Sequence, residues 1–115
     1  MKYSPISARR RQIDETLVIR DLFVNPRAAF DFVLAELNGV HPPVINKISD
    51  RAYFILSGAG TVRVGDAVFP VSEQDLVFIP KGTIHAVNGK LKYAIITSPP
   101  FDPANEQLVS RQQGG

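Results

Sequence analysis

Apolar and polar residues alternate along much of this chain, and glycine or proline repeatedly interrupts the alternation. Successive side chains of a strand point to opposite faces, so a period of two predicts strands. No segment of helical length carries a clean 3.6-residue repeat. We expect strands at residues 15–23, 29–37, 44–48, 52–56, 61–64, 67–71, 76–79, 84–87 and 91–97.

Turn-forming residues separate these segments, including Asn38-Gly39, Gly65-Asp66 and Asn88-Gly89 and the stretch 57–60. Short antiparallel strands at even spacing are typical of a barrel or jelly roll. The sequence therefore predicts an all-β, antiparallel fold. Its aromatic core is expected to contain Phe30, Phe32, Phe54, Phe69 and Phe78.

Composition narrows the class of protein. The 115 residues predict a single domain, residues 1–115, with the barrel core at about 15–98 and a C-terminal arm at 99–115. A hydrophobic content of 44% and a charged content of 21% are typical of a soluble globular domain. The chain has no cysteine, which excludes disulfides and thiolate metal sites.

Charge and hydropathy indicate few macromolecular partners. No apolar run approaches the ~18 residues needed to span a bilayer, and the start lacks the apolar stretch of a secretory signal. We therefore expect a cytoplasmic protein without a membrane partner. The net charge of +2 is too small to indicate nucleic acid, and Arg9-Arg10-Arg11 is expected to be a solvated N-terminal segment.

Two stretches carry the most specific pattern. Pro80-Lys81-Gly82-Thr83-Ile84-His85 follows the apolar run 76–79, and a fixed frame of spaced residues precedes it: Gly39, Ile45, Lys47, Arg51 and Gly58. Together they resemble the two motifs of a small single-domain cupin of the cupin-2 conserved-barrel type. Pro99-Pro100-Phe101 is similar to the end of many small bacterial cupins. The resemblance implies a double-stranded β-helix, or jelly-roll barrel, with a pocket in its mouth, and commonly a homodimer.

In that family, two histidines and a glutamate of the first motif and the histidine of the second hold a divalent metal. Here the first-motif positions carry Ile45, Lys47 and Arg51, and only His85 remains. Protonated lysine and arginine offer no lone pair. We therefore predict no metal and no cofactor. The alternative is an atypical ligand set drawn from His41, Glu36 and Asp50, which would suit a metal-dependent oxygenase or sugar isomerase.

Positive charge replaces the metal ligands. Lys47 and Arg51 are expected to point into the barrel, where two cations need an anionic partner. That partner is either an internal carboxylate (Glu36, Asp50, Glu73 or Asp75) or the carboxylate or phosphate of a bound molecule. The preferred interpretation is a metal-independent cupin that binds a small anionic molecule.

Catalysis is left open. His85, beside two cations, is expected to stay neutral and is the candidate acid/base of an isomerase, epimerase or lyase. Lys47 is a second catalytic candidate, as a base or Schiff-base nucleophile. Tyr53, Glu36 and His41 complete the expected ligand-binding set. A non-catalytic binding or sensor barrel with a decayed site is the alternative. In the implied homodimer, Leu17–Val24 is expected to pair across subunits.

Overall fold

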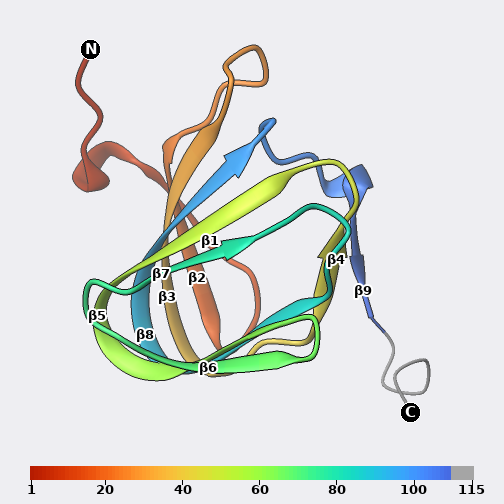
Figure 1. Cartoon of the computed structure of the whole chain (residues 1–115). Coiled ribbons are helices and arrows are strands. Elements are labelled where there is room, and N and C mark those ends of the chain that lie inside the picture. The colour runs from red at the N-terminus through yellow and green to blue at the C-terminus, as the bar shows by residue number, and fades with distance from the viewer. Residues whose placement is uncertain (110–115) are drawn as a thin grey trace.

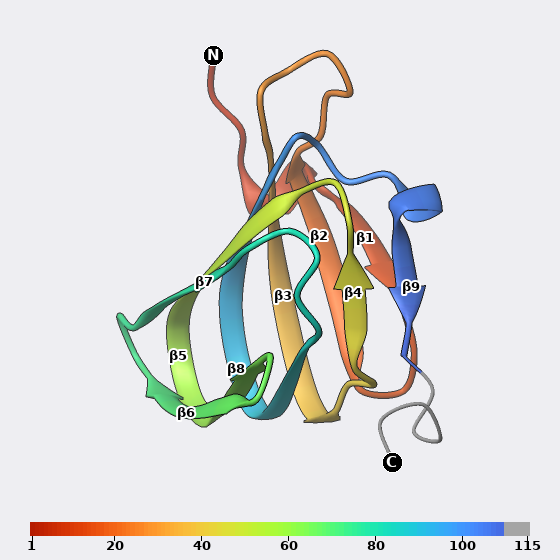
Figure 2. The same cartoon turned by 45° about the vertical axis from the view of Figure 1, so that its right-hand side comes forward.

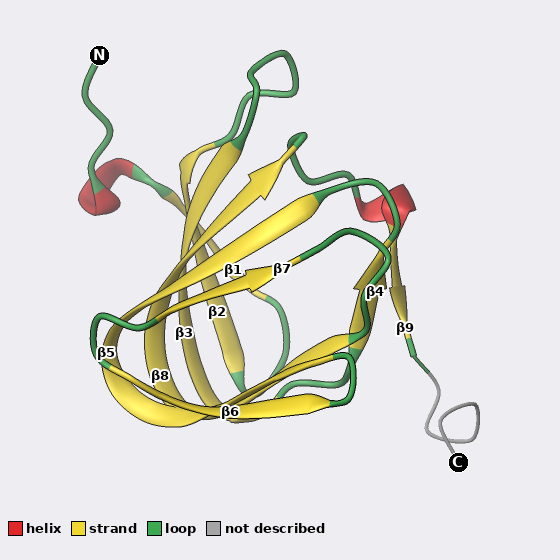
Figure 3. Cartoon of the chain, viewed as in Figure 1, coloured by secondary structure: helices red, strands yellow, loops and turns green. Residues whose placement is uncertain are grey.

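The computed structural model describes residues 1–109 and shows a barrel made almost entirely of strands (Figure 3). Two short 3-10 helices, η1 (Pro5–Ser7) and η2 (Pro103–Asn105), lie near its ends. Within residues 1–109, no helix is long and apolar enough to cross a membrane. The strands are β1 (Arg9–Gln12), β2 (Leu17–Phe23), β3 (Asp31–Val40), β4 (Val44–Asn46), β5 (Asp50–Val64), β6 (Ala67–Ser72), β7 (Leu76–Ile79), β8 (His85–Ser98) and β9 (Glu106–Leu108).

The strands form one curled sheet in the order β1-β2-β3-β8-β4-β9, and β5 joins it by pairing with β6, β7 and β8. Every pair is antiparallel, so the predicted all-β antiparallel barrel is confirmed. In Figures 1 and 2 the long strands β5, β8 and β3 form a broad curved wall. Strands β4 and β9 lie beside each other on another side of the barrel.

A row of glycines bends the two longest strands. Gly89 of β8 pairs with Gly39 of β3 on one side and with Gly60 of β5 on the other. A Cβ on Gly60 would lie 2.1 Å from the carbonyl oxygen of Asn88, so a side chain cannot fit there. The turns expected at 57–60 and 88–89 are therefore wrong, because these residues are bends within continuous strands of 15 and 14 residues.

The core lies on the inner face of the sheet and is mostly aliphatic. Ile55 and Val62 are fully buried at its centre, together with Tyr53 and Tyr93. The expected phenylalanine core is wrong. Phe54 alternates with the inward-facing Tyr53 and Ile55 and so lies on the outer face. Phe32 is likewise half-buried, and the remaining three are exposed by 44–55%: Phe30, Phe69 and Phe78.

Both termini add strands that the pattern did not predict. Arg9–Gln12, expected to be a solvated segment, forms β1 along the outer edge of β2. Since β2 then pairs with β1 on one side and β3 on the other, it has no free edge for another subunit. The predicted pairing of Leu17–Val24 across subunits would require β1 to leave this edge, and it stays a prediction. At the other end, η2 and β9 bring the C-terminal arm against β4.

Candidate functional site

The barrel contains a half-open cavity of about 410 Å³. Aliphatic side chains from the inner face of the sheet form much of its lining: Leu17, Ile19, Val33, Val44, Val87 and Ile95. Polar and charged side chains gather at two places on this lining. One group surrounds Arg51, and the other lies on β1 and β2. A cavity with a mainly apolar wall and a few convergent polar groups has the form of a small-molecule site.

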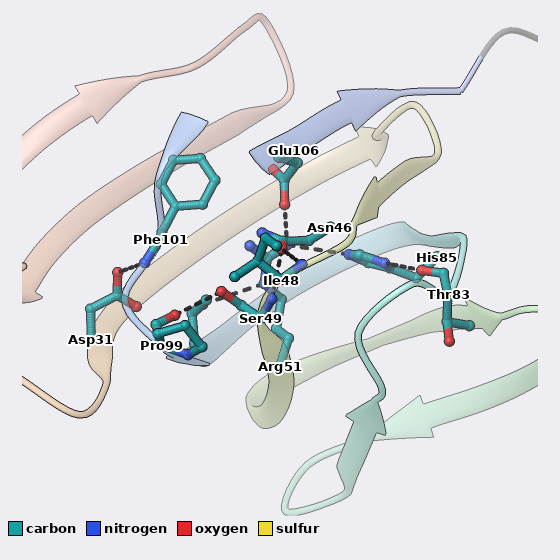
Figure 4. A network of polar contacts seen from close by, with 11 residues as sticks. Asp31, Asn46, Ile48, Ser49, Arg51, Thr83, His85, Pro99, Phe101 and Glu106 are labelled. Atoms are coloured by element: carbon teal, nitrogen blue, oxygen red, sulfur yellow. Dashed lines mark hydrogen bonds and ion pairs between the residues drawn. The ribbon is translucent and has the colours of Figure 1, made fainter. Parts of the chain in front are cut away.

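Arg51 is the centre of the first group, although it is 7% exposed. Its Nη1 atom lies 2.7 Å from Oε1 of Glu106, which comes from β9, in an ion pair rather than an aligned hydrogen bond. Its Nε donates to Oγ1 of Thr97 over a long 3.4 Å. The ring of Phe101 covers the guanidinium at 5.8 Å (Figure 4). Burial alone would lower the pKa of Arg51, but its interactions with Tyr53 and Glu106 outweigh burial and raise it.

His85 begins β8 and is 2% exposed. Its Nε2 lies 3.2 Å from Nη1 of Arg51, and its Nδ1 lies 3.1 Å from the carbonyl oxygen of Thr83. Because arginine can only donate, Nε2 must accept, and Nδ1 must carry the proton that is donated to Thr83. Burial, reinforced by the charge of Arg51, lowers the pKa of His85. The imidazole is therefore neutral, and its lone pair faces Arg51 rather than the cavity space.

Asp31 begins β3 and is 2% exposed. Its Oδ2 accepts a hydrogen bond of 2.9 Å from the backbone N–H of Phe101, as Figure 4 shows. Burial raises the pKa of Asp31, although this hydrogen bond, Thr97 and Arg51 oppose the shift. A buried carboxyl group with a raised pKa that lines a cavity is a candidate proton donor or acceptor.

Two tyrosines form the floor beside these groups. The rings of Tyr53 and Tyr93 lie 5.2 Å apart, and Tyr53 also meets His85 edge to face at 6.0 Å. Burial raises the pKa of both phenols, so each hydroxyl remains protonated. They offer a ligand hydrogen-bond donors within an aromatic surface.

The second polar group lies on β1 and β2. Arg9 and Arg11 share one face of β1 and line the cavity. Arg11 is held by Asp21, to which its Nε and Nη2 donate at 2.9 and 2.7 Å. His41 also lines the cavity and lies 3.9 Å from a carboxylate oxygen of Asp14. In total, three arginines and three acidic residues line the cavity: Arg9, Arg11, Arg51, Asp21, Asp31 and Glu106.

Four of the predicted site residues come together: Arg51, His85, Tyr53 and His41 line the same cavity. Two do not. Lys47 is exposed, and Glu36 is an exposed residue of β3 whose carboxylate lies 3.8 Å from Nζ of Lys92. The expectation that Lys47 points into the barrel is therefore wrong.

Strand register explains the error. In β4 the buried residues are Val44 and Asn46, whereas Ile45 is half-buried. The inward positions are thus one residue earlier than the motif frame assigns them, and Lys47 lies past the end of the strand. Asn46 uses its Oδ1 to accept from the N–H groups of Ile48 and Ser49, which closes the turn into β5 (Figure 4).

The counter-charge of Arg51 comes from an unexpected place. None of the carboxylates proposed from the sequence pairs with Arg51: Glu36, Asp50, Glu73 and Asp75 all lie outside the cavity lining. Glu106 was missed because it lies in the arm after the predicted barrel, where no periodicity marked a strand. Asp31 and Thr97 were also missed. Their alternation with Phe32 and Ile96 is the only signal that places them inward.

The residues do not fit a divalent metal. A cation would have to approach Nε2 of His85, which already lies 3.2 Å from the charged guanidinium of Arg51. Residues 1–109 contain no group of three or more histidine, cysteine or acidic side chains that could hold a metal ion. Guanidinium carries no lone pair, and it would repel a metal bound at the imidazole. We derive no chemistry through a metal.

Comparison with known proteins decides the family. The sequence model of the cupin domain matches residues 38–95, half of the chain. The chain belongs to the cupin family. None of the curated proteins matches it.

Solved structures share this cupin's fold at low sequence identity. A structure of Streptomyces PAC13 with uridine has a TM-score of 0.84 and 20% identity, over 95% of this chain and 89% of that one. PAC13 is described as a nucleoside dehydratase. KdgF from Halomonas sp. has a TM-score of 0.81 and 16% identity, over 90% and 99% of the two chains. Ectoine synthase from P. lautus has a TM-score of 0.73 and 13% identity, over 92% and 85%.

Proposed function

We propose that this cupin binds a compact polar molecule inside the barrel. The observation that carries the proposal is the half-open cavity of about 410 Å³, whose apolar wall meets buried polar groups at one place. Arg51, Tyr53, Thr97 and Asp31 supply donors and an acceptor around that place. The space suits a molecule with one or two small rings. The structure of PAC13 with uridine makes a nucleoside a reasonable first probe.

We propose a different ligand charge from the one expected from the sequence. An anionic ligand was expected because two free cations seemed to face the cavity. Of the two residues expected, Lys47 and Arg51, Arg51 alone lines the cavity, and Glu106 already pairs with it at 2.7 Å. Since cations and carboxylates around the cavity balance in number, we propose an uncharged polar group at the Arg51 end. A carboxylate or phosphate would bind there only by displacing Glu106.

For isomerase, epimerase or lyase chemistry, Asp31 is better placed than His85. The lone pair of His85 Nε2 is engaged by Arg51, so the ring cannot take a proton unless Arg51 moves. Asp31 lines the cavity, and burial raises its pKa, which makes its carboxyl group the candidate general acid/base. The alternative is that the same cavity only binds its ligand. An Asp31→Asn variant that retains ligand affinity would separate binding from proton transfer.

Binding can be tested by titrating ¹⁵N-labelled protein with uridine, small sugars and carboxylates while recording amide shifts. We expect saturable shifts on residues around the cavity. Val87→Phe, which adds bulk to the cavity from the inner face of β8, should abolish them, and Lys47→Ala, which changes an exposed side chain, should not. Shifts that persist in Val87→Phe, or no saturable ligand in the panel, would contradict the proposal.

Ligand charge can be tested with uridine and uridine 5′-monophosphate on the wild type and on Glu106→Gln. Removing the internal carboxylate frees Arg51, so the monophosphate should gain at least about tenfold in affinity, equivalent to about 1.4 kcal/mol. Uridine should change little. A wild-type protein that already prefers the monophosphate would restore the anionic ligand expected from the sequence.

A further inference from the structure

One part of the cavity lining lies outside the long strands of the sheet: the C-terminal arm, residues 99–109. Its strand β9 is the last in the sheet and pairs only with β4, at three positions. Two backbone hydrogen bonds flank this pairing, from Lys47 to Asn105 at 3.4 Å and from Val109 to Pro43 at 2.9 Å. Strands β3 and β8, by contrast, pair at ten consecutive positions. Few backbone hydrogen bonds would therefore break if the arm left the barrel, and segments held in this way open most readily.

The arm lies against the polar end of the cavity, where we propose that the ligand binds. The backbone N–H of Phe101 donates to Asp31 at 2.9 Å, and Glu106 pairs with Arg51 at 2.7 Å. The ring of Phe101 also lies over the guanidinium of Arg51 (Figure 4). Asp31 and Arg51 are both buried. Since the arm supplies part of their cover, its movement would expose these groups to water and to a ligand.

The seam between the arm and β4 is imperfectly paired. In the part of the chain that the structure describes, two buried side-chain polar atoms lack a hydrogen-bond partner: Nδ2 of Asn46 and Oε1 of Glu106. They belong to residues that lie directly opposite each other in β4 and β9. A buried donor or acceptor without a partner costs free energy in the closed barrel. Opening the seam lets water reach both atoms, so it recovers part of the free energy that is lost when the strands separate.

We propose that the C-terminal arm is a gate: β9 separates from β4 to let the ligand enter or leave, and then returns. Control of the ligand rests on the proposed binding function, whereas the opening itself does not. An uncharged ligand leaves the ion pair of Arg51 with Glu106 in place, so the same contacts hold the arm with and without ligand. Opening should therefore set how fast the ligand enters and leaves but not its affinity. The alternative is a fixed arm, with entry through the open side of the cavity.

Opening can be tested without a ligand, because the chain has no cysteine. Thr97→Cys places a single thiol at the polar end, on a buried residue that lines the cavity. Its reaction with N-ethylmaleimide, followed by mass spectrometry, reports access to that place. Adding Glu106→Gln removes the charge that holds the arm and should speed labelling at least about tenfold. Glu36→Gln is the matched control and should not, because it breaks an ion pair with Lys92 that lies outside the cavity lining.

Equal labelling rates in the Glu106→Gln and Glu36→Gln backgrounds would overturn the gate. A labelling rate that rises with urea as steeply as global unfolding does would also overturn it, because separation of a short arm exposes little surface. Far-ultraviolet circular dichroism of each variant establishes that it folds.

A cross-link tests whether the gate controls the ligand. Ile45 and Gln107 lie opposite each other in β4 and β9, at a separation that suits a disulfide. Neither side chain lines the cavity. The oxidised protein carrying Ile45→Cys and Gln107→Cys should slow both association and dissociation of uridine at least about tenfold, while its affinity changes by less than about twofold. Reduction of the disulfide should restore both rates.

The matched control joins Ala59→Cys to Ser72→Cys, which cross-links β5 to β6 at exposed positions and should leave both rates unchanged. Unchanged uridine rates in the oxidised arm cross-link would overturn the gate and leave the binding function in place. Faster labelling in Glu106→Gln together with no saturable ligand would support the opening of the arm and contradict the binding function.

Discussion

The wall of strands β3, β5 and β8 and the corner of strands β4 and β9 line one cavity, but different forces hold them. The wall consists of strands of 10, 15 and 14 residues that pair along most of their lengths. The corner consists of two strands of three residues each, and β4 pairs with β8 at one position. Its two strands pair with each other at three positions, and the ion pair of Arg51 with Glu106 adds a side-chain contact between the corner and β5.

This difference shows where the barrel can respond to a ligand or to pH. Backbone pairing in the wall is insensitive to protonation, whereas the corner also depends on contacts of charged groups, among them the ion pair of Arg51 with Glu106. The C-terminal arm that leads into β9 provides Phe101, Pro103 and Glu106 to the cavity lining. Changes in charge around the cavity should therefore affect the corner first.

The largest expected effect comes from a substitution that disrupts the wall. Gly58 has φ of +92°, and a Cβ on it would lie 2.1 Å from the carbonyl oxygen of Lys90. Gly58→Ala should lower the free energy of unfolding by about 3–5 kcal/mol, because it combines backbone strain with a clash against a fixed strand. Urea denaturation measures the loss.

The control for this change is Gly82→Ala. Gly82 also has a positive φ, +76°, but no atom lies within 4 Å of its Cβ position. It should cost only about 1 kcal/mol, which is the conformational penalty alone. Equal losses at both positions would show that the close approach of β5 and β8 does not control stability.

The next largest effect comes from a substitution that disrupts the corner. Arg51→Ala leaves the carboxylate of Glu106 without its partner and Nε2 of His85 without its donor. We expect a loss of about 2–4 kcal/mol in the free energy of unfolding, discounted because Glu106 is partly exposed. Lys47→Ala, at an exposed position, should change it by less than about 0.5 kcal/mol. A loss in Lys47→Ala comparable to that in Arg51→Ala would mean that both cations act inside the barrel.

Lowering the pH should further distinguish the corner from the wall. The pKa of His85 is lower in the folded protein than in the unfolded chain, so the unfolded state binds more protons as the pH falls below about 6.5. The stability contributed by neutral His85 is full above that pH and is lost below it, by up to about 1.4 kcal/mol per pH unit. Thermal denaturation between pH 7.5 and 5 should show this slope.

Two variants test whether His85 causes this pH dependence of stability. His85→Gln keeps an acceptor for Arg51 but cannot titrate, so it should flatten the dependence. His41→Gln changes the other histidine of the chain and should retain it. If His41→Gln rather than His85→Gln flattens the pH dependence, the assignment to His85 is wrong.

The smallest effect concerns Asp31, whose pKa is raised in the folded state. Its stabilising contribution is therefore present below about pH 3.9 and is lost as the pH rises through the folded-state pKa. Asp31→Asn keeps an oxygen to accept from the N–H of Phe101 and removes the buried charge. At pH 7 it should change the free energy of unfolding by no more than about 1 kcal/mol. A loss of several kcal/mol would mean that the ionised carboxylate holds the corner.

Alternation and turn residues predicted the antiparallel barrel, and the strand 76–79 matches β7. They failed where glycine bends a strand rather than ending it, since Gly89 satisfies either geometry equally well. The motif frame placed Arg51 and His85 in one cavity correctly. It could not place Lys47, because a shift of one residue in β4 reverses which side chains point inward.

The pairing of Arg51 with Glu106 could not be predicted from the sequence, for a different reason. The two residues are far apart in the chain, and the short strand that brings them together has no periodic signal. The outward-facing phenylalanines illustrate the converse. Hydrophobicity alone assigned Phe78 and Phe54 to the interior, whereas their register relative to Tyr53 places them outside.

The position of Glu106 near the C-terminus also affects how the protein is made. Strands β3 and β5 both pair with β8, so a chain emerging from the ribosome cannot close the barrel until residues 85–98 are available. The carboxylate that neutralises Arg51 emerges later still. During synthesis the guanidinium must therefore remain hydrated or find a temporary anion, and the cavity lining is completed only after β9 has followed β8 out of the ribosome.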